Sequence, residues 1–209
     1  MRPLTLGVLL FPDFELLDVF GPLEMFGMAP ESFRLVMVAA EAGEVASRQG
    51  PRVVADTGYD DAGHCDLLLV PGGRGTRVEV GNPVLLDWLR AQGDAAELVA
   101  SVCTGSGLLA RAGLLDGRRA TSNKRAFDWA MAQGDQVRWV REARWVEDGR
   151  FFTSSGVSAG IDMSLAVIGR LLGNDRAREC AASAEYEWNE DSGHDPFATL
   201  AANPETGLR

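Results

Sequence analysis

The stretch that decides the fold is Leu98-Val99-Ala100-Ser101-Val102-Cys103-Thr104-Gly105-Ser106-Gly107. A short apolar run ends at a thiol, small residues follow at once, and an apolar helical stretch then continues to residue 115. The pattern predicts a buried strand that turns sharply into a helix, with Cys103 at the turn. We expect the thiol at the carboxyl end of a sheet and beside a helix N-terminus, whose partial positive charge favours a thiolate.

Two interpretations of Cys103 follow from this pattern. A thiol at a strand-to-helix turn is placed like a catalytic nucleophile. A free cysteine is also among the most buried residue types, and a small core residue would look the same. The abrupt turn with its glycines favours the nucleophile, so the sequence predicts a cysteine enzyme.

Apolar runs alternate with helical patterns along the rest of the chain. Strands are predicted over residues 4–10, 33–40, 52–55, 65–70, 98–102, 137–146 and 150–153. Helices are predicted over residues 82–92, with Asn82 as cap, and over 127–133, 158–172 and 175–188. Asp148-Gly149 predicts a tight turn. The alternation indicates an α/β protein with a mainly parallel sheet covered by helices on both faces. A polar tail without pattern is expected from Asn189.

Length and charge limit the classes of function. A chain of 209 residues accommodates one large α/β domain, expected over 1–209, and is too short for two comfortable ones. The net charge of −10 argues against nucleic-acid partners and anionic membrane surfaces. No segment has the length of a membrane-spanning helix, and the N-terminus lacks an apolar signal region. We therefore expect a cytoplasmic protein.

Cysteine and histidine usage excludes several chemistries. The three cysteines are too widely spaced for a disulfide framework or a metal site, and Cys65 and Cys180 lie in core patterns. Of the two histidines, His64 precedes a strand, at the end opposite the expected site, and His194 lies in the polar tail. A cysteine–histidine hydrolase would lack its base. We expect no metal and no cofactor.

Asp18 is the second candidate for chemistry. It stands alone among apolar residues in Phe14-Glu15-Leu16-Leu17-Asp18-Val19-Phe20-Gly21-Pro22, so packing on the sheet would desolvate it and raise its pKa. Pro22 cannot donate a helical hydrogen bond to the Asp18 carbonyl, which predicts a helix that is interrupted or begins there. A helix-capping role for Asp18 fits equally well. Glu15 and Glu24 are interpreted as solvated helix faces.

A glycine-rich turn, Pro71-Gly72-Gly73-Arg74-Gly75, follows the buried strand at 65–70. Its backbone N–H groups would face the crevice at the carboxyl end of the sheet, where ligands of open parallel sheets bind. With the N–H of Thr104, they are candidates for an anion hole. The turn lacks the Lys-Ser/Thr ending of a phosphate-binding Walker loop.

Together these residues resemble the ThiJ/PfpI superfamily, which has the class I glutamine amidotransferase-like fold. The resemblance extends from Leu6 through Trp188. It rests on five blocks in order: Leu17-Asp18-Val19-Phe20-Gly21-Pro22, Val70-Pro71-Gly72-Gly73, Ser101-Val102-Cys103-Thr104-Gly105, Gly113-Leu114-Leu115-Asp116-Gly117-Arg118-Arg119-Ala120-Thr121 and Ser154-Ser155-Gly156-Val157-Ser158-Ala159-Gly160-Ile161-Asp162. It implies a flavodoxin-like three-layer sandwich with a nucleophile elbow.

The aspartate in the first loop is similar to the isonitrile hydratase branch of this superfamily. That branch implies a homodimer acting on a small molecule, in which the thiolate of Cys103 adds to the isonitrile carbon. Asp18 would supply the proton and then activate water, releasing an N-substituted formamide. The oxyanion and substrate-binding positions implied are Gly72, Gly73, Thr104 and Gly156.

The chain departs from many relatives after Thr121, where Ser122-Asn123-Lys124-Arg125 replaces a histidine followed by an aromatic residue. This departure argues further against peptidase chemistry. Two alternatives within the superfamily are a glutathione-independent glyoxalase and a redox sensor or stress-response protein that oxidises Cys103. A ligand-sensing module of a transcriptional regulator ranks last, because the acidic chain opposes contact with DNA.

Overall fold

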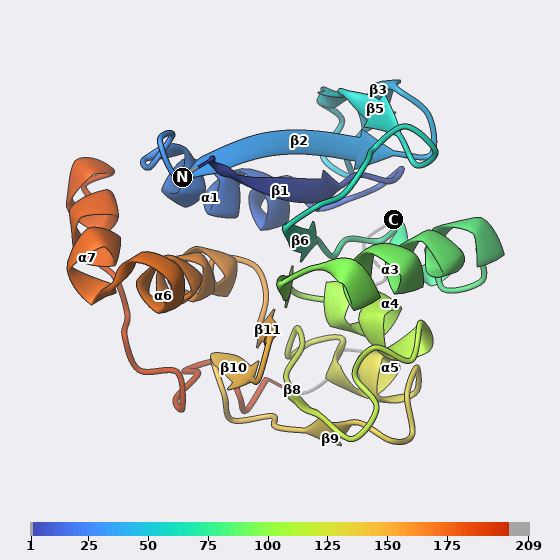
Figure 1. The fold of residues 1–209 in the computed structure, drawn as a ribbon. Coiled ribbons are helices and arrows are strands. Elements are labelled where there is room, and N and C mark those ends of the chain that lie inside the picture. The colour runs from blue at the N-terminus through green and yellow to red at the C-terminus, as the bar shows by residue number, and fades with distance from the viewer. Residues whose placement is uncertain (1, 201–209) are drawn as a thin grey trace.

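A seven-stranded sheet forms the centre of the protein in the computed structural model, which describes residues 2–200 (Figure 1). The strand order is β10-β11-β7-β6-β1-β2-β5, and every neighbouring pair is parallel except β10 with β11. The strands are β1 (Leu4–Leu9), β2 (Phe33–Ala39), β5 (Thr57–Gly58), β6 (Leu67–Val70), β7 (Leu98–Ser101), β10 (Trp145–Asp148) and β11 (Phe151–Ser154). The predicted mainly parallel sheet is confirmed.

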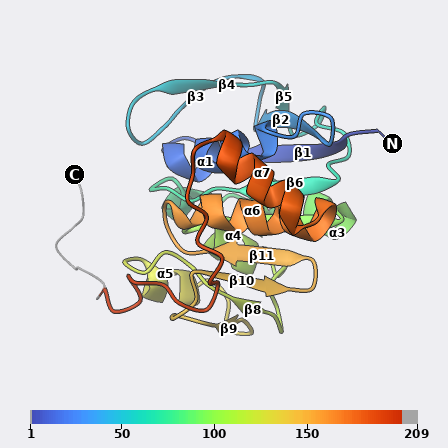
Figure 2. The ribbon, with the colours of Figure 1, turned by 90° about the vertical axis from the view of Figure 1, so that its left-hand side faces the viewer.

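Helices cover both faces of this sheet. One layer contains α1 (Leu16–Gly27), α6 (Ala159–Leu172) and α7 (Asn174–Ser183), which pack on one another and face the viewer in Figure 2. The opposite layer contains α3 (Pro83–Ala95), α4 (Gly105–Arg111) and α5 (Phe127–Met131) (Figure 1), and the short helix α2 (Thr76–Glu79) contacts α4. The fold is the expected flavodoxin-like three-layer sandwich. As predicted, the Asn82 side chain caps α3 by accepting hydrogen bonds from the backbone of Val84 and Leu85.

The central strands explain why the sheet forms and where its loops lead. Every residue of β6 and β7 is buried, as expected for strands covered on both faces. Burying each such aliphatic side chain contributes about 1.5–3 kcal/mol. Because β1, β6 and β7 are parallel, their carboxyl ends lie at one edge of the sheet. The loops that follow them lead to Asp18, Gly72 and Cys103.

The predicted strand over residues 137–146 is wrong, because the structure divides it. Residues Arg138–Trp139 form β9, which pairs with β8 (Arg119–Ala120) in a separate small sheet, and the main sheet resumes only at β10. Between β9 and β10, Nε of Arg144 donates a hydrogen bond to Oδ2 of the buried Asp162 at 2.7 Å. A second small sheet pairs β3 (Gly43–Ala46) with β4 (Arg52–Ala55), the extended piece predicted at 52–55.

Two helix predictions are also corrected. Helix α1 runs without interruption through Pro22, since burial of Leu23, Met25 and Phe26 offsets the missing hydrogen bond. Helix α7 ends at Ser183 and does not reach residue 188. The backbone turns there, with Glu185 in the left-handed region at φ 50°.

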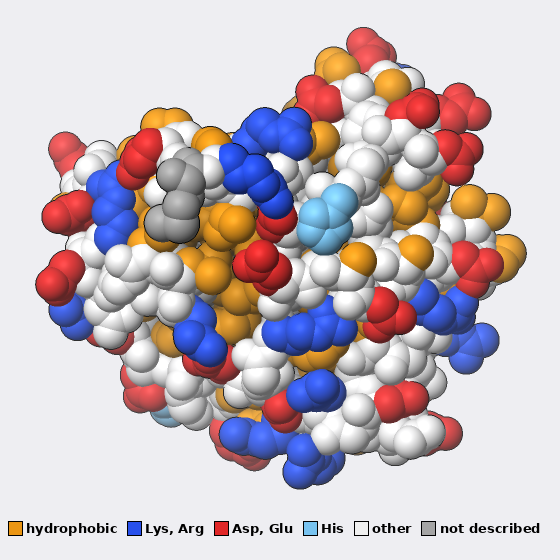
Figure 3. All heavy atoms as spheres, viewed as in Figure 1, with side chains coloured by type: hydrophobic (Ala, Val, Ile, Leu, Met, Phe, Trp, Pro, Cys, Tyr) orange, Lys and Arg blue, Asp and Glu red, His pale blue; other side chains and the backbone are white. Residues whose placement is uncertain are grey.

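The described part of the C-terminal tail is more ordered than its polar sequence predicts. Asp195 is buried, and its backbone N–H donates to the carbonyl of Glu142 at 2.8 Å. Residues 201–209 of the predicted tail lie outside the described part of the chain. Within residues 2–200, no helix has the length and apolar character needed to cross a membrane. Acidic and basic side chains are interspersed over the face that Figure 3 shows.

Asp66, at the amino end of β6, generates a prediction about stability. Its carboxylate accepts hydrogen bonds from both terminal nitrogens of Arg2, at 2.7 Å each, and from the Thr5 backbone, at 2.8 Å. The Arg2 hydrogen bond is the largest of the causes that lower the pKa of Asp66 to about 2 from 3.8. A carboxyl whose pKa is depressed by folding stabilises the protein above its unfolded pKa. That contribution disappears as the pH falls through the folded value.

We therefore expect Asp66→Asn to lower the free energy of unfolding near neutral pH by about 1–2 kcal/mol. The difference from the unaltered protein should shrink between about pH 4 and pH 2. Urea unfolding at several pH values measures this, with the exposed Asp60→Asn as the charge-matched control. A difference that stays constant down to the lowest pH would contradict the assignment.

Candidate active site

Cys103 occupies a strained turn between β7 and α4. Its backbone lies in the left-handed region at φ 58°, which is uncommon for a residue other than glycine. Its N–H is held by the carbonyls of Ser154 and Ser155, both at 3.2 Å. A Cβ added at Gly105, the first residue of α4, would collide with the backbone carbonyls of Val70 and Pro71. The predicted elbow is therefore present, and only 6% of Cys103 is exposed.

Asp18 lies in the first turn of α1 and is fully buried. Its Oδ2 atom accepts a hydrogen bond from the Gly72 N–H at 2.9 Å, whereas no group within residues 2–200 satisfies Oδ1. Burial raises the pKa of Asp18 well above its usual value, and hydrogen bonds with Gly72 and Cys103 oppose this only in part. The expected desolvation is confirmed. The alternative role as a helix cap is not, because Glu15 occupies the cap position.

Burial also raises the pKa of the Cys103 thiol, and the negative charge of Asp18 adds to the effect. The Thr104 N–H and the Asn123 side chain act in the opposite direction by hydrogen-bonding to the sulfur. The start of α4 therefore lowers the pKa of Cys103 as expected, but burial outweighs it. The helix terminus alone therefore does not lower the pKa of Cys103 enough to leave a thiolate.

The two groups consequently titrate as a pair. Two negative charges in contact within a buried site are strongly unfavourable, so the pair retains one proton over a wide pH range. The proton can reside on the carboxyl with a thiolate beside it, or on the thiol with a carboxylate. An acid and a nucleophile are thus available from the same charge state.

The glycine-rich loop is used differently from its expected role. The Gly72 N–H is engaged by Asp18, and the Gly73 N–H donates to Oγ1 of Thr104 at 3.1 Å. The hydroxyl of Thr76 donates to the same Oγ1 at 3.2 Å. These N–H groups hold the acid and the elbow in place, so they do not form an open anion hole. The N–H of Thr104 is the backbone donor directed at the sulfur.

Asn123 and Gly156 complete the surroundings of the sulfur. A Cβ added at Gly156 would lie 3.1 Å from Sγ of Cys103 and would clash with Nδ2 of Asn123, so all three groups converge. Gly156 was expected near the site, whereas no role was predicted for Asn123. The only sequence signal for Asn123 was the departure of residues 122–125 from the pattern of relatives.

The remaining acidic and histidine candidates lie away from the sulfur or have other partners. Glu15 is not a solvated helix face, because it pairs with Arg48 at 3.1 Å and accepts a hydrogen bond from Gln49. Glu24 is exposed, as predicted. Nε2 of His64 lies 3.5 Å from Oδ1 of Asp66, at the amino end of β6 and opposite the elbow.

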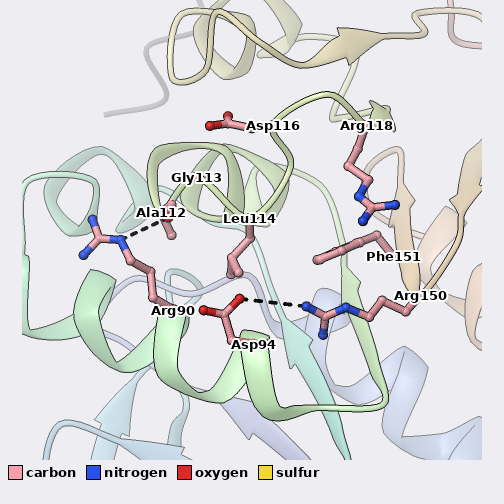
Figure 4. A pocket seen from close by; sticks show the side chains of 9 residues that line it. All are labelled: Arg90, Asp94, Ala112, Gly113, Leu114, Asp116, Arg118, Arg150 and Phe151. Atoms are coloured by element: carbon pink, nitrogen blue, oxygen red, sulfur yellow. Dashed lines mark hydrogen bonds and ion pairs between the residues drawn. The ribbon is translucent and has the colours of Figure 1, made fainter.

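A cavity of about 310 Å³ is also remote from the elbow. It lies at the amino end of β11, where Arg118 and Arg150 approach the ring of Phe151 from two sides (Figure 4). None of the predicted site residues lines it. Cys65 and Cys180 are buried free thiols, and residues 2–200 contain no group of three or more His, Cys, Asp or Glu side chains arranged to hold a metal ion.

The fold and the buried acid–thiol pair define a class, the flavodoxin-like α/β proteins with a cysteine at a nucleophile elbow. The chain belongs to the DJ-1/PfpI family, whose family model matches residues 5–170. It is 36% identical over 183 residues to an isonitrile hydratase of Pseudomonas putida, a match that covers 88% of this chain and 78% of the hydratase.

The matches also include a transcriptional regulator and a solved structure of the same family. The chain is 31% identical to the HTH-type transcriptional regulator GbdR of Pseudomonas aeruginosa, over 89% of this chain but only 52% of the regulator. Among solved structures, a ThiJ/PfpI family protein from Pseudomonas syringae superposes with a TM-score of 0.82 at 29% identity. That superposition covers 90% of this chain and 77% of the other.

The close packing at Gly72 generates a prediction. A Cβ there would lie 2.6 Å from the Thr104 nitrogen and 2.8 Å from Oδ2 of Asp18. We expect Gly72→Ala to displace the acid from the elbow, to destabilise the fold by about 1–3 kcal/mol and to change the pH profile of Cys103 alkylation.

Gly27→Ala is the matched control, because an added Cβ there meets no atom within 4 Å. It should leave the alkylation profile unchanged and alter stability by no more than about 1 kcal/mol. Unaltered stability and alkylation in Gly72→Ala would show that the loop does not hold Asp18 in place.

Proposed function

We propose that this protein hydrates the terminal carbon of an isonitrile to give an N-substituted formamide. The observation that carries the proposal is the buried pair: Asp18 has no exposed surface, one of its carboxyl oxygens is unsatisfied by the described residues, and burial raises the pKa of both Asp18 and Cys103. The similarity to the Pseudomonas putida isonitrile hydratase supports the choice of substrate.

The first half of the proposed reaction forms a covalent intermediate. The thiolate of Cys103 donates an electron pair to the isonitrile carbon, forming a C–S bond. The protonated Asp18 carboxyl transfers its proton to the same carbon as negative charge develops there. The product is a thioimidate bound to the sulfur, with Asp18 left as a carboxylate.

The second half consumes water and restores the pair. The Asp18 carboxylate takes a proton from water as the oxygen adds to the thioimidate carbon, and that proton passes to the nitrogen. The C–S bond then breaks as the carbonyl forms, and the hydroxyl proton returns to Asp18. Sulfur leaves as a thiolate, and the sum is isonitrile plus water to formamide. No separate base is required, in agreement with the remote position of His64.

The surroundings of the sulfur favour addition chemistry in an enclosed site over peroxide sensing. Cys103 is only 6% exposed, and burial raises the pKa of its thiol. Sensor cysteines are typically accessible and of low pKa. The N–H of Thr104 is the group that we assign to stabilising charge on the sulfur.

Turnover of a simple isonitrile, followed by formamide formation, tests the proposal. We expect Cys103→Ala to abolish turnover, because no other group can form the covalent bond. Asp18→Asn should reduce kcat by about 100-fold or more, since a positioned acid typically contributes that much. Cys180→Ala removes another buried thiol, on α7, and should retain full activity.

Formamide production at the unaltered rate in Cys103→Ala would exclude the mechanism. A parallel assay with methylglyoxal separates the glyoxalase alternative. Lactate formation without glutathione, together with inactivity toward isonitriles, would assign the same pair to α-oxoaldehydes and overturn the proposed substrate.

A further inference from the structure

The loop at residues 121–125 contacts both the elbow and residues 186–200, the C-terminal segment. Ser122 Oγ donates to the Cys103 carbonyl at 3.0 Å, and Nδ2 of Asn123 and the Cys103 sulfur both approach Gly156. The Asn123 Oδ1 atom accepts from the backbone nitrogens of Arg125 and Ala126, at 3.0 and 3.1 Å. Because its oxygen is engaged there, the amide presents its N–H groups to the sulfur.

The next residue, Lys124, is buried against the C-terminal segment. Only 2% of its side chain is exposed, and Nζ donates to Thr121 Oγ1 at 2.8 Å and to the Ala143 carbonyl at 2.7 Å. Nζ also lies 3.6 Å from Oδ2 of Asp195, whose side chain has no exposed surface. Asp195 is in turn fixed by the Phe197 N–H, which donates to its Oδ1 at 2.9 Å.

A second buried network fixes the start of the same segment. Asp162 of α6 accepts hydrogen bonds from the Tyr186 hydroxyl at 3.0 Å and from the Asn189 backbone at 2.9 Å. The indole of Trp188 donates to the Asp162 carbonyl at 3.1 Å. Residues 186–200 therefore have anchors at both ends, one on α6 and one on the loop that carries Asn123.

The Lys124–Asp195 pair is not explained by stability. Removing two charges from water costs several kcal/mol per ion, and apolar residues in such positions often stabilise a protein as well or better. Burial is also the main cause that lowers the pKa of Lys124 to about 8. What a buried pair of this kind provides is a fixed position for the loop that carries it.

We propose that Asp195 acts through Lys124 as a positioning residue that holds the Asn123 amide against the Cys103 sulfur. The C-terminal segment is then a working part of the site. The inference rests on the proposed role of Cys103 as nucleophile, but not on the identity of the substrate.

The test is a double-mutant cycle read at the sulfur itself. The pKa of Cys103 and its rate of alkylation by iodoacetamide are measured against pH, with mass spectrometry confirming the labelled cysteine. Asn123→Ala should raise the pKa of Cys103 and slow alkylation below that pKa by about three- to tenfold, the value of one hydrogen bond. Asp195→Asn should act in the same direction.

The double variant should be no slower than Asn123→Ala alone, because both changes remove the same interaction. Asp191→Asn is the matched control: Asp191 is an exposed acid of the same segment, and asparagine retains the acceptor for the Gly193 N–H. It should leave the pKa of Cys103 unchanged.

Asp195→Glu keeps the charge and serves if Asp195→Asn does not fold. It should give a smaller shift in the same direction, and that shift should also disappear in the Asn123→Ala background. A folded Asp195 variant with the unaltered pKa of Cys103 overturns the proposal, and so do additive effects of the two changes. Because alkylation needs no isonitrile, a failure of the proposed hydration would leave this result interpretable.

Discussion

Asp18 and Cys103 are buried together at the edge of the sheet, so ionisation of both groups at once is strongly unfavourable. Burial raises the pKa of both groups, and the charge of Asp18 further raises that of the thiol. The chemistry follows from this constraint, because a pair that shares one proton can present an acid and a nucleophile in the same state. If the carboxyl and the thiol were both solvated, each would ionise independently of the other. The site would then not hold an acid and a nucleophile in the same charge state.

The fold maintains the pair at a cost that its core offsets. A left-handed conformation at Cys103 stores about 1–3 kcal/mol. Desolvation of the Asp18 carboxyl is offset only in part, by one backbone hydrogen bond from Gly72. The parallel strands β1, β6 and β7 supply the compensating burial and bring three loops to the same edge. Glycines at positions 72 and 105 allow these loops to approach closely enough for the acid to reach the elbow.

The sequence was sufficient for the sheet and the elbow, because a buried strand followed by small residues and a helix has few structural solutions. It also placed Asp18 in an apolar segment correctly. It failed where long-range side-chain contacts override local pattern: the buried Arg144 divides a predicted strand, and Asp162 draws Tyr186 out of a predicted helix. The sequence also does not predict the raised pKa of the Cys103 thiol. Burial, which depends on the whole fold, affects this pKa more than the local helix terminus does. Asn123 carries no local signature of its orientation, which is set by backbone donors of the following residues.

The protonation state of Asp18 shows whether the buried pair shares one proton. Isotope-edited infrared spectroscopy follows the C=O stretch of its protonated carboxyl against pH, and the band is identified by its loss in Asp18→Asn. If Asp18 retains its proton beside Cys103, the band persists well above the usual pKa of 3.8, at pH values where exposed carboxyl groups are fully ionised. Ionisation of Asp18 near 3.8 would show that the acid does not retain its proton beside Cys103, and the pair could then not supply an acid and a nucleophile together.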